Sequence, residues 1–207
     1  MKKIFIFLFY LPFLLSSCKD KDGEHSSGET IVKGHVLDKG SKAKVPDALV
    51  VLCEVTYEGL FGRSVEVLKT VKTDENGFYE IKVNPISGKA YECYAEKPSE
   101  YYPHNIERKE LKEGTTNYMD HHLVAFAWFR VRLKNLQPFN HLDRISVSAP
   151  IENFGAWGDP DTTLVVKSAG NLANDFSVFV TKNGIKNQKN MSFFSSAFDT
   201  TDILIEY

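Results

Sequence analysis

The chain has 207 residues, of which 43% are hydrophobic, and 25 Lys and Arg residues nearly balance 27 Asp and Glu residues. This apolar content is ordinary for a globular protein, so a core can form without disulfide bonds. The small negative charge leaves no basic patch or tail, which excludes nucleic acid as a partner. Fifteen Phe, nine Tyr and two Trp residues favour β structure.

The first residues are typical of an export signal. Two lysines precede an apolar run over residues 4–15, which is too short to span a bilayer because a spanning helix needs about 20 residues. No later stretch is long and apolar enough to do so. The run ends at Leu15-Ser16-Ser17-Cys18, which resembles the lipobox of bacterial lipoproteins. The alternative is an ordinary secretory signal with an incidental cysteine.

The lipobox resemblance implies a signal peptide over residues 1–17 and lipidation of Cys18, with acyl chains such as palmitate anchoring the protein in a membrane. Residues 18–30 are polar and contain Gly and Ser, so they predict a flexible tether. Lys19 stands where aspartate would mark inner-membrane retention in enterobacterial lipoproteins, so the resemblance implies anchoring to the outer membrane. A periplasmic and a surface-exposed location both stay open.

Residues 31–124 show short alternating segments separated by turns, which predict β-strands. The expected strands cover residues 30–38, 47–57, 65–73, 78–83 and 90–97. Val65, Val67 and Val71 recur at even spacing and are expected on one face. Asn76-Gly77 predicts a tight turn with positive φ. The only helical signal is a single turn within residues 105–114.

The same stretch resembles the carboxypeptidase regulatory-like domain, a transthyretin-like (prealbumin-like) β-sandwich. The matching positions are Gly34, Val36, Asp38, Pro46, Ala48, Val50, Thr73, Asp74, Gly77, Phe78 and Tyr79, and residues 118–123 resemble the last strand of the family. The resemblance implies a non-catalytic accessory module of the kind found in Bacteroidota envelope proteins. The loop over residues 57–64 and the charged insertion before residue 115 depart from the family pattern.

Residues 125–207 predict a second β-sandwich-like domain. Alternating segments cover residues 125–134, 144–149, 162–168, 175–181 and 202–207, and Asn183-Gly184 predicts a hairpin. The predicted fold class is therefore all-β, with two consecutive β-sandwich domains. Cys53 and Cys93 are expected as free, buried thiols, although an oxidising envelope would permit a disulfide.

Signals for chemistry are weak. The HExxH, GxSxG and CxxC motifs are absent, and residues 74–77 lack the spacing of a calcium loop, so no cofactor or metal is predicted. Asp120 and His122 can share a strand face and bind a metal with a third ligand, but structural or solvent-facing roles for His121 and His122 are favoured. A catalytic triad assembled from distant residues stays open.

The candidate ligand-binding residues are Phe154, Trp157, Asp159 and Asp161 in a Gly- and Pro-containing stretch between two predicted strands. An exposed aromatic ring beside carboxylates can stack on a sugar ring and bind its hydroxyl groups. The favoured alternative is that Phe154 and Trp157 fold back as a lid over the end of the sandwich, since large aromatic side chains usually find cover.

The sequence thus predicts a non-catalytic envelope lipoprotein that acts in binding or assembly at the outer membrane. The family resemblance also implies that the protein acts beside a nutrient (glycan) uptake system. The expected partners are the membrane, through Cys18, and a glycan or an envelope protein. The alternatives are a cell-surface hydrolase with a site between the two domains, and a purely structural or adhesive component.

Overall fold

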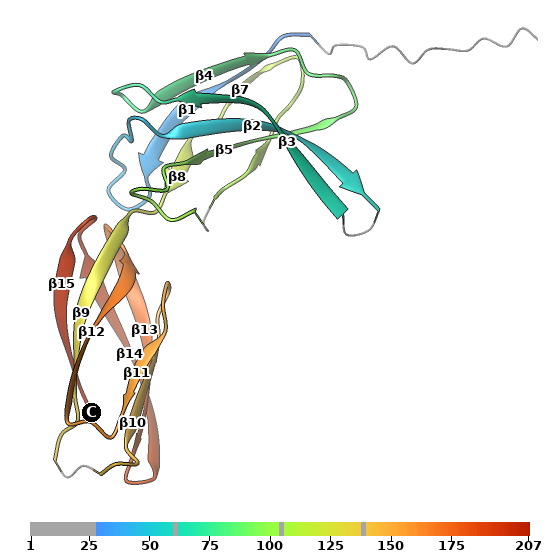
Figure 1. Cartoon of the computed structure of the whole chain (residues 1–207). Helices are drawn as coiled ribbons and strands as arrows, with labels where there is room; N and C mark the ends of the chain where they lie inside the picture. The colour runs from blue at the N-terminus through green and yellow to red at the C-terminus, as the bar shows by residue number, and fades with distance from the viewer. Residues whose placement is uncertain (1–27, 60–61, 104–105, 138–139) are drawn as a thin grey trace, which may run out of the picture.

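The computed structural model describes residues 28–59, 62–103, 106–137 and 140–207, and these form an all-β protein (Figure 1). The strands are β1 (Thr30–Asp38), β2 (Leu49–Glu58), β3 (Gly62–Lys72), β4 (Phe78–Val83), β5 (Ala90–Glu96), β6 (Lys109–Glu110), β7 (Thr116–Tyr118), β8 (His121–Leu123), β9 (Phe126–Lys134), β10 (Arg144–Ser148), β11 (Phe154–Trp157), β12 (Asp161–Ala169), β13 (Leu172–Lys182), β14 (Ile185–Ser195) and β15 (Thr200–Glu206). The predicted all-β class is confirmed, and the described part of the chain has no helix that could cross a bilayer.

The predicted signal peptide, Cys18 and residues 19–27 of the tether lie outside the described residues. The fold begins at β1, which alternates buried and half-buried side chains over its whole length. That alternation places one face of the strand in the core, as a period of two requires.

The strands before residue 124 form two sheets around one core. One sheet has the order β4-β1-β7, with β8 also paired to β1, and the other has the order β3-β2-β5-β6. The core between them contains Val36 and Ile81 from the first sheet and Leu52 and Cys93 from the second, so both sheets contribute to it. Each buried aliphatic side chain contributes roughly 1.5–3 kcal/mol, which makes this apolar layer the main source of stability.

The strands after residue 125 form a second pair of sheets with a core of its own. Their orders are β11-β10-β13-β14 and β12-β9-β15. Phe129 of β9 meets Phe176 of β13 edge to face, with 5.5 Å between ring centroids, and Ile145 and Ile205 are buried in the same cluster. Such an aromatic pair adds about 0.5–1.5 kcal/mol beyond its buried area.

The two pairs of sheets are joined without a linker, because only Val124 and Ala125 separate β8 from β9. Figure 1 shows β9 running from this junction into the lower pair of sheets. Across the junction, the Tyr102 hydroxyl donates to the Ser168 carbonyl at 3.2 Å. The boundary predicted after residue 124 falls at this link, and the independence of the two domains stays a prediction, as does the carboxypeptidase regulatory-like assignment.

The two predicted Asn-Gly turns are present. Gly77 has φ 67°, and the Asp74 carboxylate accepts hydrogen bonds from the Asn76 and Phe78 amides at 2.8 Å each. Asn183 and Gly184 both have positive φ and link β13 to β14 as a two-residue hairpin. The expected helical turn is not found among the described residues of 106–114, where Lys109–Glu110 forms β6 instead.

The predicted common face of Val65, Val67 and Val71 is wrong. Leu68 is an extra residue in β3 where the pairing with β2 shifts register. Such a bulge moves the side chains on its two sides to opposite faces of the sheet. Val71 accordingly packs against the core, whereas Val67 is 57% exposed.

The prediction of two free, buried thiols is confirmed. Cys93 pairs with Leu52 and lies in the core, so Cys53, the next residue of β2, faces the other side of the same sheet. The two side chains therefore cannot meet in a disulfide. Burial raises the pKa of the Cys93 thiol to about 12, which keeps it protonated at neutral pH.

Candidate ligand-binding face

The predicted ligand-binding residues are placed on different surfaces. Phe154 and Trp157 both lie on β11, but Phe154 packs against the core, 5.7 Å from the Phe176 ring. Trp157 is three residues further along, so it points to the outer face, where it is 68% exposed. Neither the shared aromatic site nor the lid describes this pair correctly, since Trp157 finds no cover.

The two aspartates differ in their placement relative to Trp157. Asp161 begins β12, in the other sheet, and its carboxylate accepts hydrogen bonds from the Arg132 guanidinium. That guanidinium holds the pKa of Asp161 below its usual range. Asp159 is exposed in the connection between β11 and β12. Asp161 is therefore engaged in the other sheet, whereas Asp159 follows two residues after the exposed ring.

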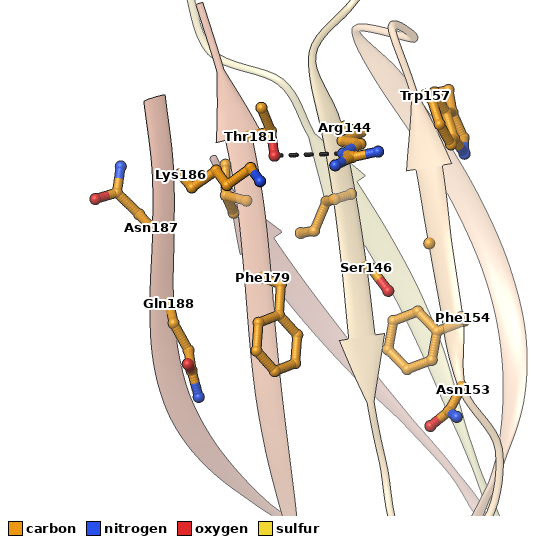
Figure 2. A pocket seen from close by; sticks show the side chains of 13 residues that line it. Arg144, Ser146, Asn153, Phe154, Trp157, Phe179, Thr181, Lys186, Asn187 and Gln188 are labelled. Atoms are coloured by element: carbon orange, nitrogen blue, oxygen red, sulfur yellow. Dashed lines mark hydrogen bonds between the residues drawn. The ribbon is translucent and has the colours of Figure 1, made fainter. Parts of the chain in front are cut away.

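A shallow groove of about 810 Å³ crosses the outer face of the sheet β11-β10-β13-β14, and we refer to it as the β10 groove (Figure 2). The residues that line it are Arg144, Ile145, Ser146, Asn153, Phe154, Gly155, Trp157, Phe179, Val180, Thr181, Lys186, Asn187 and Gln188. None of these lining residues is acidic, whereas two are cationic and several carry hydroxyl or amide groups.

Strand pairing places the side chains of the groove in rows. One row runs across the four strands as Trp157, Arg144, Thr181 and Lys186. The next row holds Gly155, Ser146, Phe179 and Gln188, with Phe179 44% exposed. Neighbouring strands lie about 4.8 Å apart, so each row of four residues spans roughly 15 Å and carries side chains of different chemical types.

Arg144 is held at the centre of the first row. Its guanidinium lies over the Trp157 ring, 5.5 Å from the centroid, and its Nε donates to the Thr181 hydroxyl at 3.3 Å (Figure 2). Its terminal N–H groups have no carboxylate partner among the described residues. The side chain is therefore oriented by its neighbours while its donors stay available.

Sequence reasoning found Trp157 but missed Arg144, Phe179 and Lys186. One signal was present, because residues 175–181 place polar side chains at every second position except Phe179. An aromatic residue at an outward position of a strand predicts an exposed ring. Phe179 lies beside Ser146 because β10 pairs with β13. The local sequence around either residue carries no information about that pairing.

The opposite outer face, on the sheet β12-β9-β15, is neutralised. Arg130 pairs with Asp202 at 3.0 Å, Lys134 with Glu206 at 3.5 Å, and Arg132 with Asp161. Exposed pairs of this kind contribute little to stability, because water and salt screen them. This face offers charges that already satisfy one another and is a poor candidate for a charged ligand.

The Asp120-His121-His122 stretch does not assemble a metal site in the described part of the chain. The predicted strand over residues 118–123 is broken into β7 and β8, and Asp120 accepts a hydrogen bond from the His35 amide at 2.7 Å. His121 is buried in the core, where desolvation lowers its pKa to about 4, with a smaller contribution from Lys109. It has the structural role that sequence reasoning favoured.

A second pocket, of about 530 Å³, lies at the junction of the two pairs of sheets, where the hydrolase alternative would place its site. Its lining is mostly apolar, with Glu152 and Lys167 as its charged residues. Glu152 accepts a hydrogen bond from the Lys167 backbone amide at 3.1 Å, and burial raises the pKa of Tyr102 to about 12. This lining brings together no nucleophile and base of the kind that a hydrolase uses.

No family model matches this chain, and no curated protein matches it. Several solved structures, pilins among them, align with 86% of the chain. The minor pilin GBS52 of Streptococcus agalactiae is 9% identical, with a TM-score of 0.39 and 94% of its length covered. The shaft pilin SpaA of Lactobacillus rhamnosus GG is 12% identical, with a TM-score of 0.34 and 97% of its length covered.

The TIE protein of Bacillus anthracis is 11% identical, with a TM-score of 0.38. This chain spans 34% of the length of that protein. Scores of this size describe a distant likeness between β-proteins.

Proposed function

We propose that the chain is a non-catalytic, lipid-anchored envelope protein that binds a glycan in the β10 groove. The observation that carries the proposal is the exposed Trp157 ring beside an oriented Arg144, with Phe179 in the next row. Exposed aromatic side chains gathered on one face mark an interaction site, because isolated proteins normally cover such surface.

A sugar chain suits the chemistry of the groove. A flat indole ring offers an apolar surface for the C–H face of a pyranose, and Ser146 and Gln188 offer a hydroxyl and an amide group for its hydroxyls. The groove is open and extends over several strands, so a chain can enter it at any point. It contains no deep apolar cavity of the kind that a small hydrophobic ligand requires.

The location rests on the N-terminal motif. Lipidation of Cys18 would hold the protein at the outer membrane, on its periplasmic or its surface side, and a tether over residues 18–30 would span up to about 40 Å. A glycan-binding protein held there would concentrate a polysaccharide beside an uptake system. That accessory role is part of the proposal.

Calorimetric titration of the purified chain with a panel of soluble polysaccharides tests the binding site. We expect Trp157→Ala to weaken binding about tenfold, since a stacked aromatic ring contributes roughly 1–1.5 kcal/mol. Phe179→Ala should weaken it less, because that ring is less exposed. Leu204→Ala, on the opposite face, is the matched control and should bind like the wild type.

Equal binding by all three variants would show that the binding site lies outside the β10 groove. Failure of every polysaccharide to bind would favour the structural or adhesive alternative. Shortening of a bound polysaccharide during incubation would favour the hydrolase, and Glu152→Gln at the junction pocket would then be the first variant to assay.

A further inference from the structure

Arg144 differs from every other arginine in the described part of the chain. Arg63 and Arg108 pair with Glu92, Arg130 with Asp202, and Arg132 with Asp161, each within 4 Å. No described carboxylate lies within that distance of Arg144. The protein thus pairs its other described arginines and leaves the one in the groove without an anionic partner.

Lys186 repeats this arrangement on the same row. It lies on β14, with Thr181 of β13 between it and Arg144, and no acidic residue lines the groove around it. Two strand spacings, roughly 10 Å, separate the backbone positions of the two residues. Among the described residues, the row therefore presents two positive side chains without carboxylate partners, with an aromatic ring at one end.

This positive strip is local. Without Lys2 and Lys3 the chain has 23 basic and 27 acidic residues, a net charge of −4. A general attraction to anions is therefore not expected. Charge complementarity at the groove would act at close range, since exposed charges are screened over about 8–10 Å at physiological ionic strength.

We propose that the β10 groove selects acidic glycans, with Arg144 binding the carboxylate of a uronic acid residue while Trp157 stacks on a neighbouring sugar ring. The terminal N–H groups of Arg144 form a planar fork that matches a carboxylate, and Thr181 and Trp157 orient that fork. Lys186 takes a second carboxylate further along the chain. This inference rests on the proposed glycan-binding function and names its substrate class.

An acidic peptide is the other anionic polymer to consider. It would offer carboxylates to the same cations but no flat ring of C–H groups for Trp157, which is 68% exposed, or for Phe179. The combination of two unpaired cations with two exposed aromatic rings therefore favours the sugar chain.

The experiment compares polygalacturonate with its methyl-esterified form, which keeps the backbone and masks the carboxylates. Titration of the full chain at low salt should give binding to polygalacturonate about tenfold tighter than to the ester, and added salt should reduce the difference. Arg144→Gln should lose about tenfold toward polygalacturonate and little toward the ester, and Lys186→Gln should lose a few fold.

Two further variants separate charge from geometry and folding. Arg144→Lys keeps the charge without the planar fork and should recover only part of the affinity. Arg130→Gln, an arginine on the opposite face, should bind like the wild type, and equal thermal midpoints would show that all variants fold.

The outcomes distinguish the inference from the proposed function. Equal binding of both polymers, with loss in Trp157→Ala, would overturn the acidic selectivity and leave glycan binding in place. Binding of polyglutamate as tightly as polygalacturonate would overturn the sugar as occupant. Failure to bind either glycan, in a panel where neutral polysaccharides also fail, would overturn both.

Discussion

At the scale of single residues, His121 couples stability to pH. Its imidazole is buried beside Tyr79, with 5.9 Å between ring centroids. Desolvation favours the neutral form and lowers the pKa to about 4 from an ordinary 6.5. Between these two values the unfolded chain binds a proton that the native state excludes.

The folded state should therefore lose stability as the pH falls from about 6.5 to 4, with the contribution of His121 complete above pH 7. Linkage over that window gives on the order of 3 kcal/mol. His121→Leu removes this titrating group. Denaturant titrations at pH 7 and 4.5 should show a smaller acid loss in the variant than in the wild type, and equal losses would contradict the assignment.

Gly77 is the second residue whose local geometry predicts a measurable cost. Its φ of 67° disfavours a side chain, and a Cβ there would lie 2.9 Å from the Val36 carbonyl oxygen. Gly77→Val should lower the free energy of unfolding by more than about 1 kcal/mol. Gly88 also has positive φ but has open space around it, so Gly88→Val is the control and should cost less.

At the scale of strands, the sequence predicted structure correctly where apolar and polar side chains alternate with a period of two. The alternation in β1 and the Asn-Gly pairs at 76–77 and 183–184 carry enough local information to predict strands and turns. The bulge at Leu68 is different, because an extra residue changes the facing of a strand without changing its composition. The β10 groove is also non-local, since its rows form only when β10 pairs with both β11 and β13.

The bulge can be tested with two substitutions of the same kind. Val71→Lys places an ammonium group against the core and should lower the free energy of unfolding by about 1–3 kcal/mol. Val67→Lys acts on an exposed side chain and should change it by less than about 0.5 kcal/mol. Similar costs at both positions would mean that the two valines share a face after all.

At the scale of the whole molecule, the proposed anchor decides where the binding face operates. We expect Cys18→Ala to abolish incorporation of labelled palmitate and to release the protein from membranes or block its maturation, because acylation needs the thiol. Unchanged labelling of the variant would exclude Cys18 as the acylated residue.

The side of the membrane is a separate prediction. Surface exposure predicts that proteinase K digests the folded part of the chain in intact cells, with a periplasmic protein as the control for intactness. Protection until the outer membrane is broken would place the protein in the periplasm.

The connection through β8 has a mechanical consequence for a tethered binding protein. β1 is the first strand after the proposed anchor, and β8, which leads into β9, lies parallel to β1 in the register Val36↔His121 to Asp38↔Leu123. A pull between the anchor and the β10 groove therefore draws the start of β1 and the end of β8 apart along their common axis. The inter-strand hydrogen bonds are then loaded in shear, all together, and we expect single-molecule extension along this axis to require more force than peeling the β13–β14 hairpin from its turn.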